Sequence, residues 1–278
     1  MVVSTKLAGG MGNQMFQYAF ARKISLLTNR EVILNLSFLN QKDGNHTKRD
    51  YDLDLFKISE NFSSDKVSQG HLDIIENGVM YNDHLSQKYK DLDNRSSIFL
   101  QGFWQSPKYF REIEDNIIEE FQFKKTLNNS TYLNMLDEIT STKSVMVAVR
   151  RTDYLNNNHH GVMPIEYYEK AKKYIEFKVS NPNYFVFSDD IEWATFNLKS
   201  IFKNATFFQN EEECVGDRFS GKFELMKNCK NFIIPNSTFS WWPAYLSRST
   251  NKTVVYPLKW YTGSDTSIIP EDSNWHGV

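Results

Sequence analysis

Residues 145–154 read VMVAVRRTDY, and this stretch decides the fold of the chain. Its five apolar residues are followed directly by polar ones, which predicts a short buried strand. The strand ends in two arginines, a threonine and an aspartate. Ligands of parallel α/β sheets bind outside the carboxyl ends of the strands, so residues 150–153 stand where a ligand would bind.

Downstream of this stretch, apolar runs and helical patterns alternate. Further strands are predicted at residues 184–187, 205–208, 232–234 and 254–256. Helices are predicted at residues 164–177, 191–198, 219–229 and 239–246. A strand, a polar turn and a helix in repeated order are typical of a doubly wound parallel sheet.

The chain begins with a second α/β pattern. A strand, the loop Gly9-Gly10-Met11-Gly12, a helix and a strand are predicted within residues 2–36. Residues 37–94 are less periodic and are interpreted as loops and short helices. A strand at 98–103 and helices at 107–123 and 131–141 follow. The predicted architecture is α/β, with two Rossmann-like domains, residues 1–143 and 144–278, facing a central cleft. The last residues of the chain are expected to pack back on the N-terminal domain.

The composition is that of a soluble globular protein, with 40% hydrophobic and 24% charged residues among 278. A net charge of −2 offers no general attraction for nucleic acid, so an anionic substrate must be held by a local cluster. Two cysteines make no disulfide framework and indicate a reducing compartment. The sequence lacks a secretion signal and an apolar run of about 20 residues, so a cytoplasmic location is expected.

The arginine pair has two interpretations. Arg150 and Arg151 present rigid forks of donors that suit the oxygens of a phosphate or a carboxylate. With Asp153 close by, they could equally form an ion pair on the domain surface. The loop at residues 9–12 resembles a phosphate cradle, but it lacks the Walker and dinucleotide patterns, so a tight strand-to-helix turn explains it as well.

Polar clusters also follow the second and fourth strands of the C-terminal half. Hydroxyl and backbone N–H groups at the start of a helix suit a phosphate, but a serine or threonine there is also an ordinary N-cap. Carboxylates at a helix start can cap it or accept hydrogen bonds from a ribose or base. The residues concerned are Ser188, Asp189, Asp190, Asn236, Ser237, Thr238 and Ser240.

No metal site is predicted. His159 and His160 are adjacent, without further ligands at metal-binding spacing, and are interpreted as part of a solvated loop. Asp52 and Asp54 have the spacing of an acidic motif that holds a divalent ion. They lie between apolar residues, in a segment without a confidently predicted strand.

Together these elements resemble glycosyltransferase family 11, the α-1,2-fucosyltransferases, over nearly the whole chain. LAGGMGNQMFQYAF at residues 7–20 is similar to the family's opening signature, and VRRTDY at 149–154 resembles its H-x-R-R-G-D-Y element. FVFSDD at 185–190 and IIPNSTFSWWPAYL at 233–246 resemble later elements. Two positions depart from the pattern, because Ala148 replaces the motif histidine and Thr152 replaces the usual glycine.

The resemblance implies a GT-B fold and inverting transfer of L-fucose from GDP-β-L-fucose to the 2-hydroxyl of a terminal galactose. GDP-fucose is a co-substrate, and no metal or other cofactor is implied. Arg150 and Asp153 are the predicted catalytic residues. The general base is left open among Asp153, His159, His160 and Glu166. The implied donor-binding residues are Gly10, Gly12, Asn13, Arg150, Arg151, Ser188, Asp189, Asp190, Asn236, Ser237, Thr238 and Ser240.

The resemblance also suggests the partners. The acceptor would be a galactose-containing polysaccharide or lipid-linked oligosaccharide, which is compatible with peripheral association at the inner face of the membrane. Its pocket is expected in the N-terminal half, within residues 37–94. Another GDP-sugar as donor, or a non-catalytic glycan-binding relative, is the alternative, and Ala148 is the feature that favours the latter. The oligomeric state is not indicated.

Overall fold

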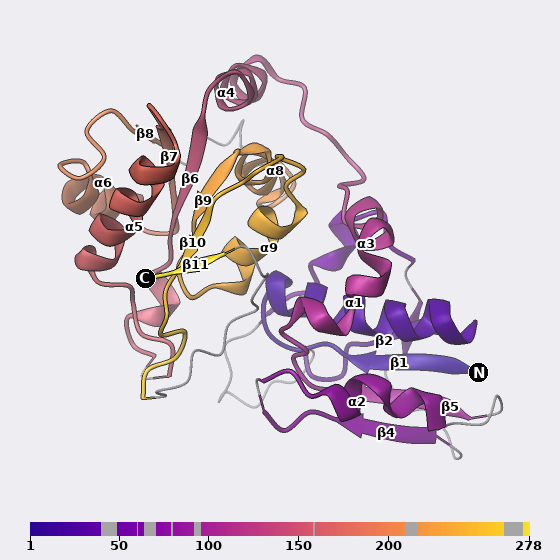
Figure 1. Cartoon of the computed structure of the whole chain (residues 1–278). Coiled ribbons are helices and arrows are strands. Elements are labelled where there is room, and N and C mark those ends of the chain that lie inside the picture. Colours follow the sequence, from indigo (N-terminus) through magenta and orange to yellow (C-terminus); the bar gives the residue numbers. More distant parts are fainter. Residues whose placement is uncertain are drawn as a thin grey trace. The chain divides into compact units, whose positions relative to one another are not determined.

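The computed structural model describes residues 1–39, 49–59, 61–63, 71–78, 80–91, 96–157, 159–208, 216–263 and 275–278. The chain divides into two compact units. The first is Met1–Lys124 and the second begins at Lys125. Figure 1 shows the order of the elements along the chain, and each unit is described by itself.

The first unit is built on a five-stranded sheet of order β3-β2-β1-β5-β4, in which all pairings are parallel. Because β1 pairs with β2 on one side and with β5 on the other, the switch point of this sheet lies between β1 and β5. The strands are β1 (Val2–Lys6), β2 (Glu31–Asn35), β3 (Phe62–Ser63), β4 (His71–Ile75) and β5 (Ser97–Gln101).

Helix α1 (Met11–Thr28) follows β1 and packs along β1 and β2. Its Phe16 and Phe20 are fully buried. The predicted helix is thus confirmed, and it begins inside the glycine loop, at Met11. Shorter helices between β2 and β5 are η1 (Leu53–Leu55), α2 (Asp83–Gln87) and η2 (Lys88–Asp91).

Strand β4 was missed by the sequence analysis, which expected only loops and short helices in residues 37–94. It pairs with β5 along five residues, from His71 opposite Ser97 to Ile75 opposite Gln101. Only Ile74 of this strand is buried. An edge strand with one buried side chain lacks the apolar run by which a central strand of a parallel sheet is recognised in a sequence.

The single helix expected at residues 107–123 is also wrong. The segment forms three short helices, η3 (Pro107–Tyr109), η4 (Arg111–Ile113) and α3 (Glu114–Glu120). Phe110, between the first two, has φ −140°, outside the helical range. Phe110 is itself fully buried and packs against Phe16, so tertiary packing overrides the helical pattern.

The second unit is built on a six-stranded parallel sheet of order β11-β10-β9-β6-β7-β8. Read from β8, this is the 3-2-1-4-5-6 order of a Rossmann fold, whose switch point lies between β6 and β9. The strands are β6 (Ser144–Val149), β7 (Asn183–Ser188), β8 (Thr206–Phe207), β9 (Asn231–Ile233), β10 (Val254–Tyr256) and β11 (His276–Gly277).

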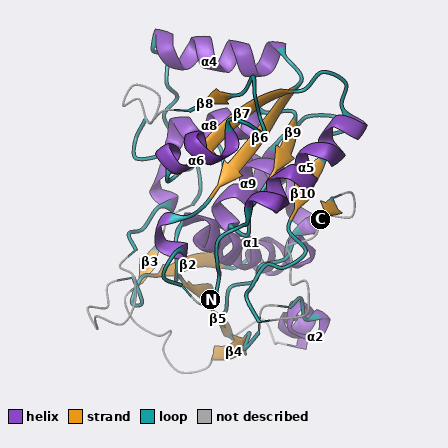
Figure 2. Cartoon of the chain, turned by 90° about the vertical axis from the view of Figure 1, so that its left-hand side faces the viewer, coloured by secondary structure: helices purple, strands orange, loops and turns teal. Residues whose placement is uncertain are grey.

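Helices cover both faces of this sheet (Figures 1 and 2). The helices α5 (Ile165–Lys178) and α6 (Ile191–Leu198) lie on one face, and α8 (Ser220–Asn228) and α9 (Thr238–Leu246) lie on the other. Val145, Val147 and Val149 of β6 form the core beneath α5 together with Tyr167, Tyr168, Ala171 and Ile175. The alternation of strands and helices predicted for this half is confirmed.

Helix α4 (Ser130–Ser141) belongs to the second unit, where it packs against α8. The division at Lys124 therefore precedes α4, whereas the sequence analysis set it after this helix. The last residues were expected to pack back on the N-terminal domain. Residues 264–274 lie outside the described residues, and β11 pairs with β10 of the second unit.

In the described part of the chain, no helix combines the length and the apolar character needed to cross a membrane. Cys229 is free and fully buried. The other cysteine, Cys214, lies outside the described residues.

Candidate active site

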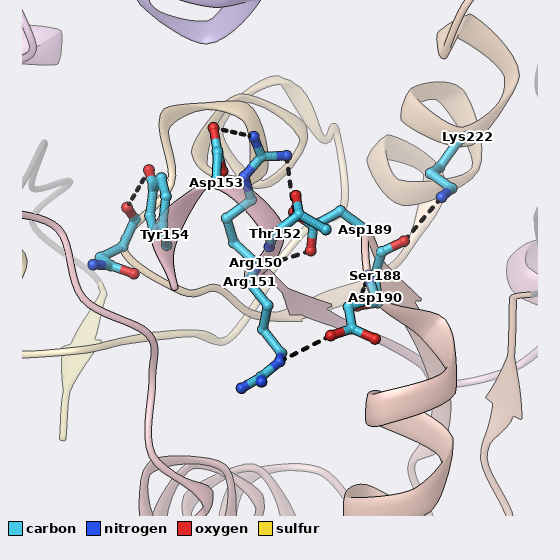
Figure 3. A network of polar contacts seen from close by, with 10 residues as sticks. Arg150, Arg151, Thr152, Asp153, Tyr154, Ser188, Asp189, Asp190 and Lys222 are labelled. Carbon is cyan, nitrogen blue, oxygen red and sulfur yellow. Dashed lines mark hydrogen bonds and ion pairs between the residues drawn. The ribbon is translucent and has the colours of Figure 1, made fainter. Parts of the chain in front are cut away.

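The second unit gathers the predicted arginines and carboxylates at one edge of its sheet. Strands β6 and β7 pair in register, with Val149 opposite Ser188. Both strands end there, so the residues that follow, Arg150 and Asp189, are neighbours in space. A short helix, η5 (Thr152–Tyr154), turns the chain away from the sheet. Figure 3 shows the polar network that results.

Asp189 anchors the arginine loop. One carboxylate oxygen, Oδ1, accepts a hydrogen bond from the backbone N–H of Arg151 at 2.9 Å. The other, Oδ2, accepts from the backbone N–H and the hydroxyl of Thr152, at 3.1 and 2.6 Å. Oδ2 also lies 3.3 Å from Nη1 of Arg150. A single carboxylate therefore fixes both the backbone of the loop and the guanidinium.

Arg150 forms two ion pairs. In addition to the contact with Asp189, its Nη2 donates to Oδ2 of Asp153 at 2.7 Å. Burial lowers the pKa of Arg150, but the hydrogen bond to Asp153 and the charge of Asp189 outweigh it and raise the pKa. The ion-pair interpretation left open by the sequence is thus realised. A guanidinium carries five N–H groups, so these two contacts leave it able to bind an anion, and its side chain is 27% exposed.

Arg151 and Asp190 form a second pair beside the first (Figure 3). Nε of Arg151 lies 3.2 Å from Oδ2 of Asp190, and the guanidinium lies 3.8 Å from the centre of the Trp193 ring. The other oxygen of Asp190 accepts from the backbone N–H of Trp193 and so caps α6. Of the two carboxylates, Asp190 is therefore the helix cap and Asp189 holds the arginine loop.

The start of α9 lies across the switch point from the arginines, since β6 and β9 pair directly. Ser237 occupies the N-cap position, but its hydroxyl makes no capping hydrogen bond. Ser237 and Ser240 are buried. A helix N-terminus at the switch point of a Rossmann sheet is the usual binding place of a phosphate. Contact of Ser237, Thr238 and Ser240 with the donor remains a prediction.

Asn236 holds three segments together. Its Nδ2 donates to the backbone carbonyls of His160, Gly161 and Trp260, at 2.8, 3.2 and 3.0 Å. The backbone carbonyl of Asn236 accepts a hydrogen bond from the hydroxyl of Tyr154 at 3.2 Å. Asn236 was predicted to bind the donor, and its side-chain amide nitrogen is engaged within the protein, where the residue links the arginine loop to β9.

Lys222 was not predicted from the sequence. It projects from α8 and donates to the backbone carbonyl of Ser188 at 3.1 Å (Figure 3). Burial lowers its pKa, and the charge of Asp189 acts in the opposite direction. The side chain thus brings a third cationic group to the ends of β6 and β7. A lysine on a polar helix surface carries no sequence signal that separates it from its exposed neighbours.

An aromatic stack supports the arginine loop. Tyr154 and His160 are stacked with ring centres 4.7 Å apart, and His159 is stacked on Tyr261 at 4.4 Å. His160 and Tyr261 lie 5.3 Å apart and connect the two pairs. His160 is therefore partly buried in an aromatic cluster, whereas His159 is exposed, so the expected solvated loop is found for His159 and not for His160. Burial is the largest of the causes that lower the pKa of His160 to about 4.

Replacing His160 by phenylalanine is expected to remove a pH-dependent loss of stability. The unfolded chain takes up a proton at His160 near the ordinary pKa of 6.5, whereas the folded chain does so only near 4. The unfolded state binds more protons in this window, so the free energy of unfolding falls as the pH drops from 6.5 to 4.

The measurement is urea unfolding of both proteins at intervals from pH 7.5 to 4.5. At pH 7.5 His160 is neutral in both the folded and the unfolded state. The difference in the free energy of unfolding between the two proteins at this pH gives the pH-independent cost of the substitution. Equal slopes for the two proteins below pH 6.5 would contradict the assignment of a buried neutral imidazole.

Among the remaining base candidates, Asp153 is ion-paired with Arg150, and Glu166 lies exposed in the first turn of α5. Ala148, where the family has a histidine, is a buried strand residue whose carbonyl accepts from the Tyr168 hydroxyl at 3.4 Å. Within the described residues, no group of three histidines, cysteines, aspartates or glutamates could hold a metal ion. Asp54 lies in η1, and Asp52 is the residue that precedes this helix.

The glycine loop belongs to the first unit. Gly9 has φ 76°, in the left-handed region, and a Cβ there would lie 2.4 Å from Nδ2 of Asn13. Gly10 is the N-cap residue of α1, and Gly12 lies in its first turn. The backbone N–H of Asn13 donates to the Gly10 carbonyl at 2.9 Å. The loop is therefore a tight turn, as one of the two interpretations held, and a ligand role of Gly10, Gly12 and Asn13 remains a prediction.

Two buried glutamines, which the sequence analysis did not single out, hold this loop. Gln14 donates to the carbonyls of Gly9 and Asp50, at 3.0 and 2.8 Å. Gln17 accepts from the backbone N–H of Ala8 and donates to the carbonyl of Gly102, at 2.9 and 3.0 Å. Glutamines at three-residue spacing in an otherwise apolar helix face were the available signal.

The chain matches the model of the glycosyl transferase family 11 over residues 6–274. It is 32% identical to the O-antigen biosynthesis glycosyltransferase WbnK of Escherichia coli, over 96% of this chain and 97% of that protein. It is 30% identical to an α-1,2-colitosyltransferase of Escherichia coli, over 99% and 98% of the two chains. It is also 26% identical to galactoside α-(1,2)-fucosyltransferase 1 of Rattus norvegicus, over 86% of this chain and 62% of that protein.

Solved structures support the fold. A mutant of Arabidopsis thaliana FUT1 in complex with GDP aligns with a TM-score of 0.52 at 13% identity, over 92% of this chain and 70% of that one. The α-1,6-fucosyltransferase NodZ of Bradyrhizobium, soaked with GDP-fucose, aligns with a TM-score of 0.50 at 12% identity, over 88% and 93%. The predicted GT-B-like α/β fold is confirmed. From the family match and the two bacterial relatives, the chain is a member of glycosyl transferase family 11.

Proposed function

We propose that this chain is an inverting fucosyltransferase that moves L-fucose from GDP-β-L-fucose to the 2-hydroxyl of a terminal galactose. The observation that carries this proposal is the pair of arginines fixed by Asp189 at the switch point of the second sheet, in a member of family 11. The names of the relatives support the linkage, and the ligands of NodZ and FUT1 support a GDP-sugar.

In this reaction the acceptor oxygen bonds to C1 of fucose as the bond from C1 to the β-phosphate oxygen breaks. The electron pair of that bond stays on GDP, so negative charge grows on the diphosphate. Arg150 and Arg151, with the N-terminus of α9 opposite, would neutralise this charge without moving, because the loop is already held in place. The proton of the acceptor hydroxyl passes to a base, for which we propose Asp153, one of the four candidates that the sequence left open.

The proposal is tested by incubating the protein with GDP-fucose and a set of galactosides, followed by linkage analysis of the product. An α-1,2-linked fucosyl galactoside is expected. If the folded protein forms no fucosylated product with any galactoside while it turns over another GDP-sugar, the donor assignment is wrong.

The colitosyltransferase relative favours one second candidate, a GDP-sugar of the same shape as GDP-fucose but with one hydroxyl fewer. Colitose is fucose without its 3-hydroxyl. A site built to hydrogen-bond that hydroxyl discriminates strongly, whereas a site that only accommodates it does not. The ratio of kcat/KM for GDP-fucose and GDP-colitose therefore decides between the two donors.

Removal of divalent ions is expected to leave the reaction unchanged. The charge on the leaving GDP is assigned here to arginines and a helix N-terminus, so no step requires a metal. The measurement is the initial rate of transfer with and without EDTA, with added Mg²⁺ as the control. A loss of activity that Mg²⁺ restores would contradict this assignment and direct attention to Asp52 and Asp54.

The proposed acceptor is a galactose-containing repeat of a polysaccharide or a lipid-linked oligosaccharide. The O-antigen biosynthesis role in the name of WbnK supports this choice. Such an acceptor is compatible with a cytoplasmic enzyme that works at the membrane face.

A further inference from the structure

The first unit has a switch point of its own, between β1 and β5. The glycine loop follows β1, and residues 102–105 follow β5, the neighbouring strand on the other side of the switch. Thr5 lies opposite Leu100, so both segments leave the same edge of the sheet. This is the position at which an open parallel sheet binds a ligand.

A buried carboxylate fixes the turn at residues 102–105. Glu76 follows β4, and its Oε2 accepts from the backbone N–H groups of Phe103 and Trp104, at 2.9 and 2.7 Å. Its Oε1 accepts from the hydroxyl of Tyr109 at 2.9 Å. Burial raises the pKa of Glu76, and the hydrogen bonds oppose that shift. A buried carboxylate with all these donors aimed at it orders the turn from inside the protein.

The turn has an unusual backbone that depends on this carboxylate. Trp104 has φ 54°, a left-handed conformation that is costly for a bulky residue. Its ring is fully buried, and the centre of the ring lies 4.6 Å from that of Phe20. Packing in the core therefore holds the turn in place. A Cβ at Gly102 would lie 2.6 Å from Cβ of Glu76, so the close approach of the two segments needs glycine.

The turn contacts the glycine loop through two amides. Nε2 of Gln105 donates to Oδ1 of Asn13 at 2.9 Å. This hydrogen bond fixes the orientation of the Asn13 amide, whose nitrogen lies over Gly9. Glu76, the turn and Gln105 thus form one connected support for the side chain of Asn13.

Phe103 stands apart from this packed support. Its backbone is held by Glu76, yet its side chain is 38% exposed, whereas the ring of the next residue, Trp104, is fully buried. An exposed ring on a rigid turn, beside oriented amides, offers the combination of an apolar face and a few fixed polar groups that suits a sugar. Neither residues 9–13 nor residues 102–106 include a lysine or an arginine, so this edge suits a neutral ligand better than a diphosphate.

We propose that residues 102–105 form a subsite for the acceptor sugar, in which the Phe103 ring packs against a pyranose and Glu76 acts as a positioning residue. This inference rests on the proposed function, because it identifies residues that would bind the acceptor sugar in the same reaction. The sequence analysis expected the acceptor pocket within residues 37–94. Glu76 comes from that segment, but the surface it shapes is the turn after β5.

The experiment compares steady-state kinetics of the wild type, Phe103→Ala and Phe103→Tyr with GDP-fucose and a galactoside acceptor. Phe103→Ala is expected to raise KM for the galactoside about tenfold or more, while KM for GDP-fucose changes less than twofold. Phe103→Tyr keeps the ring and is expected to restore the acceptor KM. The matched control is Phe196→Ala, which removes a ring that is 88% exposed on α6. An unchanged acceptor KM in Phe103→Ala, or a failure of Phe103→Tyr to restore it, would overturn the proposal.

Glu76 is tested by a second pair of variants. Glu76→Ala removes the acceptor of both backbone N–H groups and is expected to raise the acceptor KM at least as much as Phe103→Ala. In Glu76→Gln the amide oxygen can still accept from Phe103 and Trp104, so most of the acceptor affinity is expected to return. A Glu76→Gln variant with the full defect of Glu76→Ala, at equal binding of GDP by calorimetry, would contradict the positioning role.

The two proposals fail in distinguishable ways. If the wild type transfers no fucose to any galactoside, the proposed function fails before the variants are compared. If the wild type is active and Phe103→Ala leaves the acceptor KM unchanged, only the acceptor subsite is wrong.

Discussion

Replacing Arg150 by alanine is expected to lower kcat of the transferase about 10²–10³-fold. In the folded protein the Arg150 guanidinium is fixed between Asp153 and Asp189 at the carboxyl end of β6. It is therefore in place before charge develops on the leaving diphosphate. Since the charge grows during the reaction, kcat should fall more than the affinity for GDP-fucose.

The measurement is the rate of transfer at saturating GDP-fucose, together with the Kd for GDP-fucose from calorimetry in the absence of an acceptor. Arg150→Lys keeps the charge but loses the planar fork, so it should recover only part of the rate. Arg248→Ala is the matched control, because Arg248 is exposed just beyond α9 in the same unit. Turnover at the wild-type rate by folded Arg150→Ala would remove Arg150 from the mechanism.

The C-terminal half could be predicted almost completely from the sequence. Its central strands are buried on both faces and therefore appear as uninterrupted apolar runs, as at Val145–Val149, where every residue is buried. The ends of these strands carry the polar clusters, so the predicted fold also indicated where the candidate site would lie. Which carboxylate caps α6 and which holds the arginine loop could not be predicted, since Asp189 and Asp190 differ only in the direction of their side chains.

The N-terminal half was predicted less well for a physical reason. Strand β4 lies at the edge of its sheet and buries a single side chain, Ile74. The strand predicted at 98–103 ends earlier, at Gln101, because the next residues form a turn. In this turn Trp104 adopts a left-handed backbone and donates to a carboxylate 28 residues earlier in the chain, Glu76. A contact between segments that distant has no periodic signal, so the candidate acceptor element was visible only in the structure.

Asp189→Ala is expected to reduce transfer nearly as much as Arg150→Ala, although Asp189 is a positioning residue in this account. The substitution removes the acceptor for the backbone N–H groups of Arg151 and Thr152 and one of the two carboxylates that hold Arg150. The Arg151 N–H is partly buried and the Thr152 N–H is exposed, so each lost hydrogen bond costs about 0.5–1.5 kcal/mol. Together with the lost ion pair to Arg150, this should let the loop relax away from its present conformation. Arg150 would then lose its orientation while keeping its charge.

The decisive comparison is a double-mutant cycle in kcat with Arg150→Ala, Asp189→Ala and the double variant. If Asp189 acts through Arg150, the double variant should be no more than a few-fold slower than the slower single variant. Asp217→Ala is the matched control, because it removes an exposed partner of Lys125, and such surface pairs contribute only about 0–1 kcal/mol. If the two losses multiply in full, Asp189 instead acts independently of Arg150, as expected for a carboxylate that accepts hydrogen bonds directly from the nucleotide.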